Sequence, residues 1–347
     1  MRKLLLIFLL VSFMTVPIHA EELTAPTVPD SAQELMPPDT ESFAEGLLYV
    51  LKSAIKTFQP EIKAGFGLCL SVLAVMMVTS LLDGFSGNAK GITELVGTLA
   101  VACILLSNAN TLISYGADTV KELSEYGKLL IPVMATALAA QGGVTGSATL
   151  YAGTAAFDGI LCSLISGILM PMLYIFLVLA IGTGAIDQDI LKRLRDFVKW
   201  LVSWCLKTVM YIFTGYITIT GVVSGTTDQA TLKAAKLTIS GAVPVVGGIL
   251  SDASEAVLVS AGLVKNAVGI YGLIAIAAVF IGPFIRIGAQ YLLLKLTAAV
   301  CGVFGSKRTT ELVGDFSCAM GLLLAMTGAV SLILLISMIC FMKGVSG

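Results

Sequence analysis

The residues that could carry chemistry in this chain are the few ionisable ones within or beside long apolar stretches. The densest basic cluster consists of Lys192, Arg193, Arg195 and Lys199. Steps of three or four residues place one polar stripe on a single helix face: Lys192, Asp196, Lys199, Ser203 and Lys207. The stripe predicts either the lining of a cavity or subunit interface, or a Lys207 side chain that extends back to the lipid headgroups.

A second polar group contains Arg286, Gln290 and Lys295. Nine residues separate Arg286 from Lys295, which puts them on opposite faces of one helix. We therefore expect Arg286, close to Pro283, to lie at an interface, and the more deeply placed Lys295 to contact another helix.

Residues 237–251 form an apolar segment broken by helix-disrupting residues, namely Pro244, Gly247 and Gly248. Residues 129–141, with Pro132, form another. Because broken backbone cannot face lipid, each predicts a short span or a re-entrant hairpin shielded by other helices. For residues 241–252 the alternatives are a cavity or interface lining, and a kinked span packed against its neighbours.

Residues that support enzymatic chemistry are scarce. His19 is the only histidine, and the seven cysteines stand singly in apolar stretches. The chain contains no phosphate-binding GxxxxGK[ST] loop, and the spans predicted below contain no Asp or Glu. We therefore expect no catalytic residue, no metal, no cofactor and no enzymatic activity.

The elements that must position these residues are membrane helices. Hydrophobic residues make up 57% of the chain and charged residues 12%, and the mean hydropathy is +0.95. Seven stretches are long and apolar enough to span a bilayer: 64–82, 95–115, 160–184, 200–223, 267–285, 287–305 and 319–342. With the two broken segments, the sequence predicts an all-α, polytopic integral membrane helical bundle of about seven to nine spans.

The N-terminal region predicts that the residues after it are exported across the membrane. Residues 1–20 have a basic beginning and a short apolar core, which is typical of a signal peptide. Residues 21–63 then predict an extracytoplasmic acidic leader followed by an amphipathic helix over 42–58, and residues 64–347 a polytopic transmembrane domain. The positive-inside rule assigns the Lys192–Lys199 cluster to the cytoplasm, which makes the protein a multi-pass component of the cell membrane.

One stretch carries a family resemblance: GAVPVVGGILSDASEAVLVSAGLVKNAVGIYGL, residues 241–273. Its proline-glycine break, its Ser251-Asp252 pair and its Lys265-Asn266 pair come in an order similar to that of the stage III sporulation protein AE family of endospore-forming Firmicutes. The resemblance covers roughly residues 40–342 and implies no catalytic residue.

The resemblance implies a place in a secretion-like channel complex in the mother-cell membrane that surrounds the forespore. The implied partners are sister stage III sporulation A proteins, including a cytoplasmic ATPase and ring-forming subunits, and indirectly stage II sporulation protein Q of the forespore. The alternative is a self-contained secondary transporter for a small solute or ion. An inverted repeat and acidic residues at the membrane midplane would favour that alternative.

Overall fold

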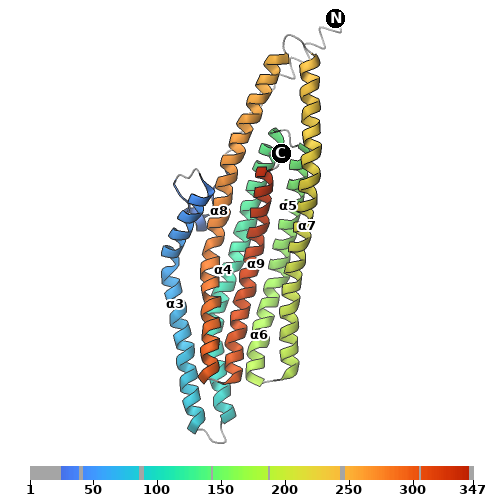
Figure 1. Ribbon diagram of the computed structural model, residues 1–347. Coiled ribbons are helices and arrows are strands. Elements are labelled where there is room, and N and C mark those ends of the chain that lie inside the picture. The colour runs from blue at the N-terminus through green and yellow to red at the C-terminus, as the bar shows by residue number, and fades with distance from the viewer. Residues whose placement is uncertain are drawn as a thin grey trace.

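A computed structural model shows an elongated bundle of long helices (Figure 1). The structure describes residues 25–38, 42–85, 90–141, 144–186, 188–242, 247–304 and 306–343, with the backbone alone for Lys90, 220–242, 247–265 and Phe304. Within these ranges all regular structure is helical: α2 Asp30–Gln33, α3 Phe43–Phe85, α4 Lys90–Ala140, α5 Val144–Leu164, the π-helical turn η2 Ile165–Leu169, α6 Met170–Ile186, α7 Asp189–Ala242, α8 Gly247–Phe304 and α9 Lys307–Lys343.

Helices α3, α6 and α8 end, and α4, α7 and α9 begin, at the same end of the bundle, and α9 ends towards the other (Figure 1). Two contacts fix this arrangement. The hydroxyls of Thr98 in α4 and Thr309 in α9 are 2.9 Å apart, and Arg195 near the start of α7 pairs with Asp315 in α9. The Lys192–Lys199 cluster and the pair formed by Lys307 and Arg308 therefore belong to one end, which we call the basic end.

Within the described residues, six helices are long and apolar enough to cross a membrane, which confirms the predicted class of fold. The predicted spans 267–285 and 287–305 are wrong as separate spans, because α8 continues through Pro283 and Arg286. The predicted break at residues 129–141 is also wrong, because α4 continues through Pro132 to Ala140. The prediction for residues 237–251 falls partly outside the described residues, and Pro244 lies there; Gly247 and Gly248 begin α8.

Proline interrupts these helices less than the sequence suggests, because packing on neighbouring helices outweighs one missing hydrogen bond. Around Pro132, the side chains of Leu130, Ile131 and Met134 are buried in the core. Pro171 lies two residues after the π-helical turn η2, whose wider backbone relieves the clash between a proline ring and the carbonyl four residues earlier. As a result, α5, η2 and α6 form one continuous membrane-crossing unit, Val144–Ile186.

The amphipathic helix predicted over 42–58 does not end there. It continues through Pro60 into the first span as the 43-residue helix α3. The predicted boundary at residue 63 thus lies inside a helix. Ahead of it, the short helix α2 is held against α4, because the Ser31 hydroxyl donates to Glu122 Oε2 at 2.5 Å and Ala32 is fully buried.

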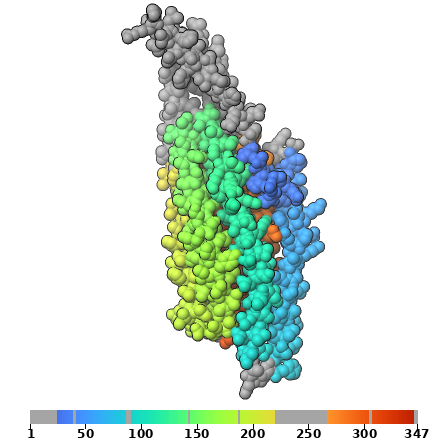
Figure 2. All heavy atoms as spheres, turned by 180° about the vertical axis from the view of Figure 1, so that it is seen from behind, coloured from blue at the N-terminus to red at the C-terminus, as the bar shows by residue number. Residues whose placement is uncertain are grey.

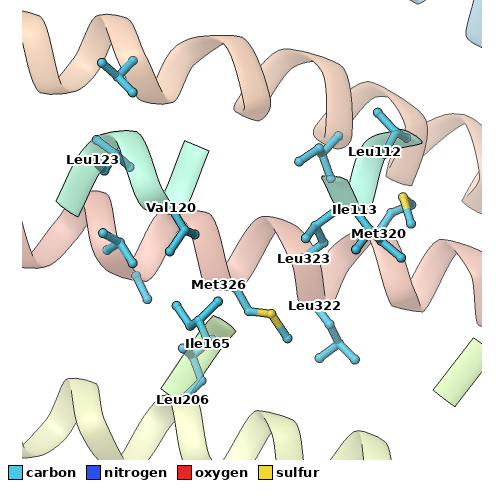
Figure 3. Close-up of a cluster of buried hydrophobic side chains, with 14 of the residues drawn as sticks. Leu112, Ile113, Val120, Leu123, Ile165, Leu206, Met320, Leu322, Leu323 and Met326 are labelled. Carbon is cyan, nitrogen blue, oxygen red and sulfur yellow. The ribbon is translucent and has the colours of Figure 1, made fainter. Parts of the chain in front are cut away.

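Helix α9 occupies the centre of the bundle and contacts α4, α5, α6, α7 and α8. Figure 3 shows its side chains Met320, Leu323 and Met326 among those of α4, η2 and α7. Glycine permits the closest approaches: a Cβ on Gly127 of α4 would lie 2.7 Å from Leu334 Cδ2 of α9. Small residues at such crossings let membrane helices pack without a hydrophobic driving force.

The helices are longer than a bilayer is thick. The 51 residues of α4 would extend about 77 Å at about 1.5 Å per residue, against about 30 Å of hydrocarbon. The exposed large hydrophobic side chains on α4 lie between Ile92 and Leu106, except Leu129, and exposed charges begin at Asp118. On α3 the exposed apolar stretch runs from Phe66 to Phe85. We call these two stretches the α3–α4 apolar band.

Candidate functional site

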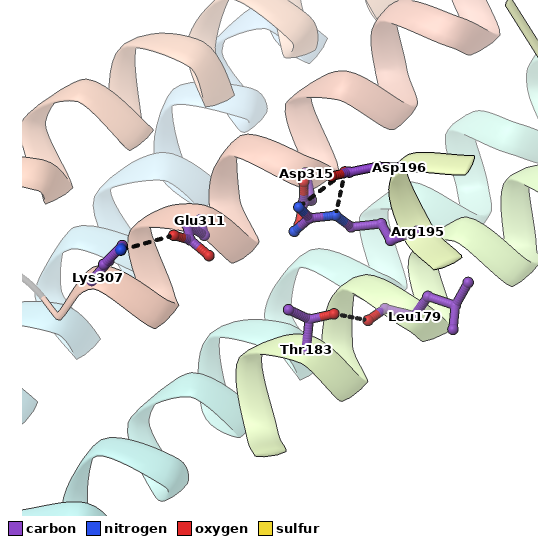
Figure 4. A network of polar contacts seen from close by, with 7 residues as sticks. All are labelled: Leu179, Thr183, Arg195, Asp196, Lys307, Glu311 and Asp315. Atoms are coloured by element: carbon purple, nitrogen blue, oxygen red, sulfur yellow. Dashed lines mark hydrogen bonds and ion pairs between the residues drawn. The ribbon is translucent and has the colours of Figure 1, made fainter. Parts of the chain in front are cut away.

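The first polar cluster lies at the basic end, between α7 and α9 (Figure 4). Arg195 Nη1 donates to Asp315 Oδ2 at 2.6 Å, and Arg195 Nε donates to Asp196 Oδ1 at 3.1 Å. The Arg195 and Asp315 side chains are 13% and 17% exposed, so this charge-assisted pair is largely shielded from water. It fixes the start of α7 against α9.

Arg195 is the residue of the basic cluster that pairs with Asp315. It lies on the helix face that continues through Val198, Val202 and Leu206, all of which are buried. On the predicted polar stripe, Lys199 and Lys207 are exposed and Lys192 is half-buried. The whole cluster is helical, because α7 begins at Asp189.

The neighbouring turn at the basic end is tied to α4. Thr98 bonds to Thr309 in a buried position, and Ser306 Oγ accepts a hydrogen bond from the Thr309 amide at 3.3 Å, which caps the start of α9. Arg308 and Glu94 approach to 4.0 Å. Polar contacts thus join α4, α7 and α9 at the basic end.

The second polar cluster lies further up the bundle, where α3, α4 and α8 meet. Arg286 of α8 forms an ion pair with Glu61 of α3. Its guanidinium carbon also lies 4.1 Å from the ring centroid of Tyr115 and 6.0 Å from that of Phe58. A cation over an aromatic face is attracted by the ring's negative charge, so Arg286 joins three helices.

Beside this ion pair is a cavity of about 170 Å³. Polar side chains from the three helices line it, and they are Glu61, Asn108, Thr111, Arg286 and Gln290. The Gln290 side chain is 4% exposed, and its amide nitrogen has no hydrogen-bond partner. The cavity is therefore polar, and the Gln290 amide at its floor is a hydrogen-bond donor without an acceptor.

The Lys295 side chain is exposed on α8, on the face away from Arg286, and its contact with another helix stays a prediction. Of the two asparagines in α4, Asn110 accepts a hydrogen bond from the Tyr174 hydroxyl of α6 at 3.0 Å, and Asn108 lines the cavity.

A third polar site was missed from the sequence. Asp158 in α5 is 2% exposed, and its Oδ2 accepts a hydrogen bond from the Ser124 hydroxyl of α4 at 2.9 Å. Close by, the Thr154 hydroxyl donates to Ser337 of α9 at 2.9 Å. Asp158 lies just before the predicted span 160–184, and the helical spacing Thr154, Asp158, Leu161 was the available signal that it faces inward.

These clusters join helices of the bundle. Among the residues that the structure describes, no group of His, Cys, Asp and Glu could hold a metal ion. The fold and its polar contacts define a polytopic, all-helical membrane protein.

Comparison with known proteins gives the family. A sequence model of stage III sporulation protein AE matches residues 39–344, so the chain belongs to the stage III sporulation protein AE family. It is 25% identical over 207 residues to the stage III sporulation protein AE of Bacillus subtilis (strain 168), which covers 60% of this chain and 52% of that protein. The matched region thus spans about half the length of that relative. No solved structure matches the chain.

Proposed function

We propose that the chain is a membrane subunit of a multiprotein, secretion-like channel between mother cell and forespore, required for endospore formation and without catalytic activity of its own. The observation that carries this proposal is the family match over residues 39–344. A bundle whose polar contacts join helices suits a structural or export-gate subunit.

In this proposal the basic end faces the mother-cell cytoplasm. The exposed side chains of Arg193, Lys199 and Lys307 supply the positive charge that favours a cytoplasmic location. Residues 43–63 and the end of α9 then lie on the opposite side of the mother-cell membrane, facing the forespore.

The helices are long enough to contact partner proteins on both sides of the membrane. Above the α3–α4 apolar band, residues 117–140 of α4 would extend about 35 Å beyond the hydrocarbon. The ring-forming sister proteins, and indirectly stage II sporulation protein Q, would meet this projecting part. The cytoplasmic ATPase would act at the basic end.

Crosslinking in sporulating cells, followed by purification of this chain, tests the proposal. We expect the sister ring proteins and the ATPase to be recovered with it. A sharper version uses Arg193→Glu with Lys199→Glu, which reverses charge at the basic end but retains the Arg195–Asp315 pair. These changes should reduce recovery of the ATPase, and unchanged recovery together with normal sporulation would count against the assignment.

One observation favours the second candidate, a secondary transporter for a small solute or ion: Asp158 is a buried carboxyl group of the kind that couples ions. Its partner Ser124 lies six residues above Asp118, the first exposed charge on α4 beyond the apolar band. The site is therefore about 9 Å or more outside that band rather than at its middle. Ion-dependent solute uptake by the purified chain in vesicles would support the transporter instead.

A further inference from the structure

The cavity between α3, α4 and α8 has the features of a ligand site. Its mouth is on the outer surface, because Ala64 and Thr111 are exposed, and its floor is inside the bundle, because Gln290 and Leu112 are buried. In Figure 2, atoms of α8 (orange) are visible between α3 and α4.

The depth of the cavity indicates what could enter it. Towards the basic end, the surface next to the mouth is apolar, with Phe66 and Leu70 of α3 and Leu106 of α4 exposed. Towards the other end it is charged, with Lys63 and Asp118 exposed. The mouth thus lies at the upper edge of the α3–α4 apolar band, where lipid headgroups lie.

The side chains in the cavity offer both charge signs. Arg286 and the unpartnered Gln290 amide supply donors for a phosphate, with the Thr111 hydroxyl and the Asn108 amide at the wall. Glu61 supplies a carboxylate that a phosphate would avoid but an ammonium group would approach. This combination is complementary to a zwitterion, not to a simple anion.

We propose that this cavity binds the headgroup of a zwitterionic phospholipid that carries a phosphodiester and a primary ammonium, as in phosphatidylethanolamine. The phosphate accepts hydrogen bonds from Arg286 and Gln290, and the ammonium donates to Glu61. At about 30 Å³ for each water, the cavity of about 170 Å³ has room for five or six waters or for one such headgroup. The acyl chains extend along the apolar band beside Phe66 and Leu70.

The test uses the delipidated full-length chain in detergent. Its melting temperature is measured with dioleoylphosphatidylethanolamine, with the phosphatidylcholine analogue, whose ammonium cannot donate, with the phosphatidylglycerol analogue, which lacks the ammonium, and with soluble phosphoethanolamine. We expect phosphatidylethanolamine to raise the melting temperature by about 5 °C at about 100 times its dissociation constant, and the other lipids to do less. An equal shift with soluble phosphoethanolamine would identify the free headgroup as the ligand and contradict binding of the lipid.

Gln290→Leu separates a ligand site from a merely structural residue. Because the Gln290 amide nitrogen has no protein partner, this change should leave the lipid-free melting temperature unchanged or higher, yet abolish the preference for phosphatidylethanolamine. Glu61→Gln should remove the discrimination between phosphatidylethanolamine and phosphatidylcholine. Lys295→Gln, on the exposed face of the same helix, is the matched control and should retain both.

Two outcomes would overturn the proposal. Equal shifts with all three lipids would mean that the cavity holds water only, and a full response in Gln290→Leu would mean that lipid binds elsewhere. Both results concern the isolated chain, so neither bears on whether the chain assembles with sister sporulation proteins.

Discussion

Truncating Arg195 should destabilise the bundle more than neutralising its partner Asp315. An exposed ion pair contributes up to about 1 kcal/mol, whereas breaking a fully buried pair costs about 3–5 kcal/mol. Exposures of 13% and 17% are closer to the buried case, so we expect Arg195→Leu to cost about 3 kcal/mol. Asp315→Asn should cost only about 1.5 kcal/mol, because Arg195 keeps Asp196 at 3.1 Å.

The two tryptophans of the chain provide the assay. Trp200 and Trp204 lie on α7, within three turns of Arg195, and their rings stack with centroids 6.1 Å apart. Thermal unfolding of the detergent-solubilised chain, followed by tryptophan fluorescence, therefore reports directly on this helix. At about 2 °C per kcal/mol for a chain of this size, Arg195→Leu should lower the melting temperature by about 6 °C and Asp315→Asn by about 3 °C.

A double-mutant cycle decides whether the pair is the cause. The double variant should lose no more stability than Arg195→Leu alone, because the two residues act on each other. Arg193→Leu is the control: Arg193 is exposed, so its loss should cost no more than about 0.5 kcal/mol. The reasoning fails if Arg193→Leu is as damaging as Arg195→Leu, or if the costs of the two single changes simply add.

Further outcomes follow from the packing and the polar contacts. Gly127→Val should cost about 1–3 kcal/mol, because its Cβ would press on Leu334, and thermal unfolding would reveal a site that tolerates it. Asp158→Leu should destabilise by about 1–3 kcal/mol by leaving the Ser124 hydroxyl unpaired, whereas Asp158→Asn should cost clearly less; equal losses in a melting assay would refute this. Lys207→Leu should reduce crosslinking to sister subunits while shifting the melting temperature of the purified chain by no more than about 1 °C, and undiminished crosslinking would leave Lys207 facing lipid.

The class of fold could be predicted because membrane helices leave a strong local signal in apolar runs. The local pattern did not show which helices continue through a proline or a charged residue. Arg286 next to Pro283 looked like the boundary between two spans, but α8 runs through both. The group that accommodates Arg286 is Glu61, 225 positions earlier in the chain, and no local pattern connects two residues so far apart.

The candidate site was predicted in part for a similar reason. Helical spacing gives the residues that share a face, but it does not say which face meets the bundle. The polar stripe that includes Lys199 and Lys207 was chosen for its charge, although the stripe of Arg195, Val198 and Val202 carries the apolar residues that seek the core. Weighing the apolar neighbours of each charge would have singled out Arg195.

The positions of the exposed apolar surfaces along the bundle axis constrain the orientation of the bundle in a membrane. On α7 the exposed large hydrophobic residues begin at Ile190 and Leu194 and continue to Ile219, the last residue of α7 whose side chain the structure describes. They rise about 44 Å, which is longer than the α3–α4 apolar band. The register between them follows from the two contacts at the basic end. Ile92 is six residues below Thr98, Asp315 is six residues above Thr309, and Ile190 is five residues below Arg195.

The α7 surface therefore begins about 10 Å further from the basic end than the α3–α4 apolar band does. In an upright bundle with that band in hydrocarbon, the exposed Arg193 would lie about 15 Å above Ile92, inside the hydrocarbon. A tilt of the bundle brings both apolar surfaces into the hydrocarbon and returns the lysine and arginine side chains to the headgroups. Packing between helices and anchoring side chains at the headgroups set the angle of such a tilt.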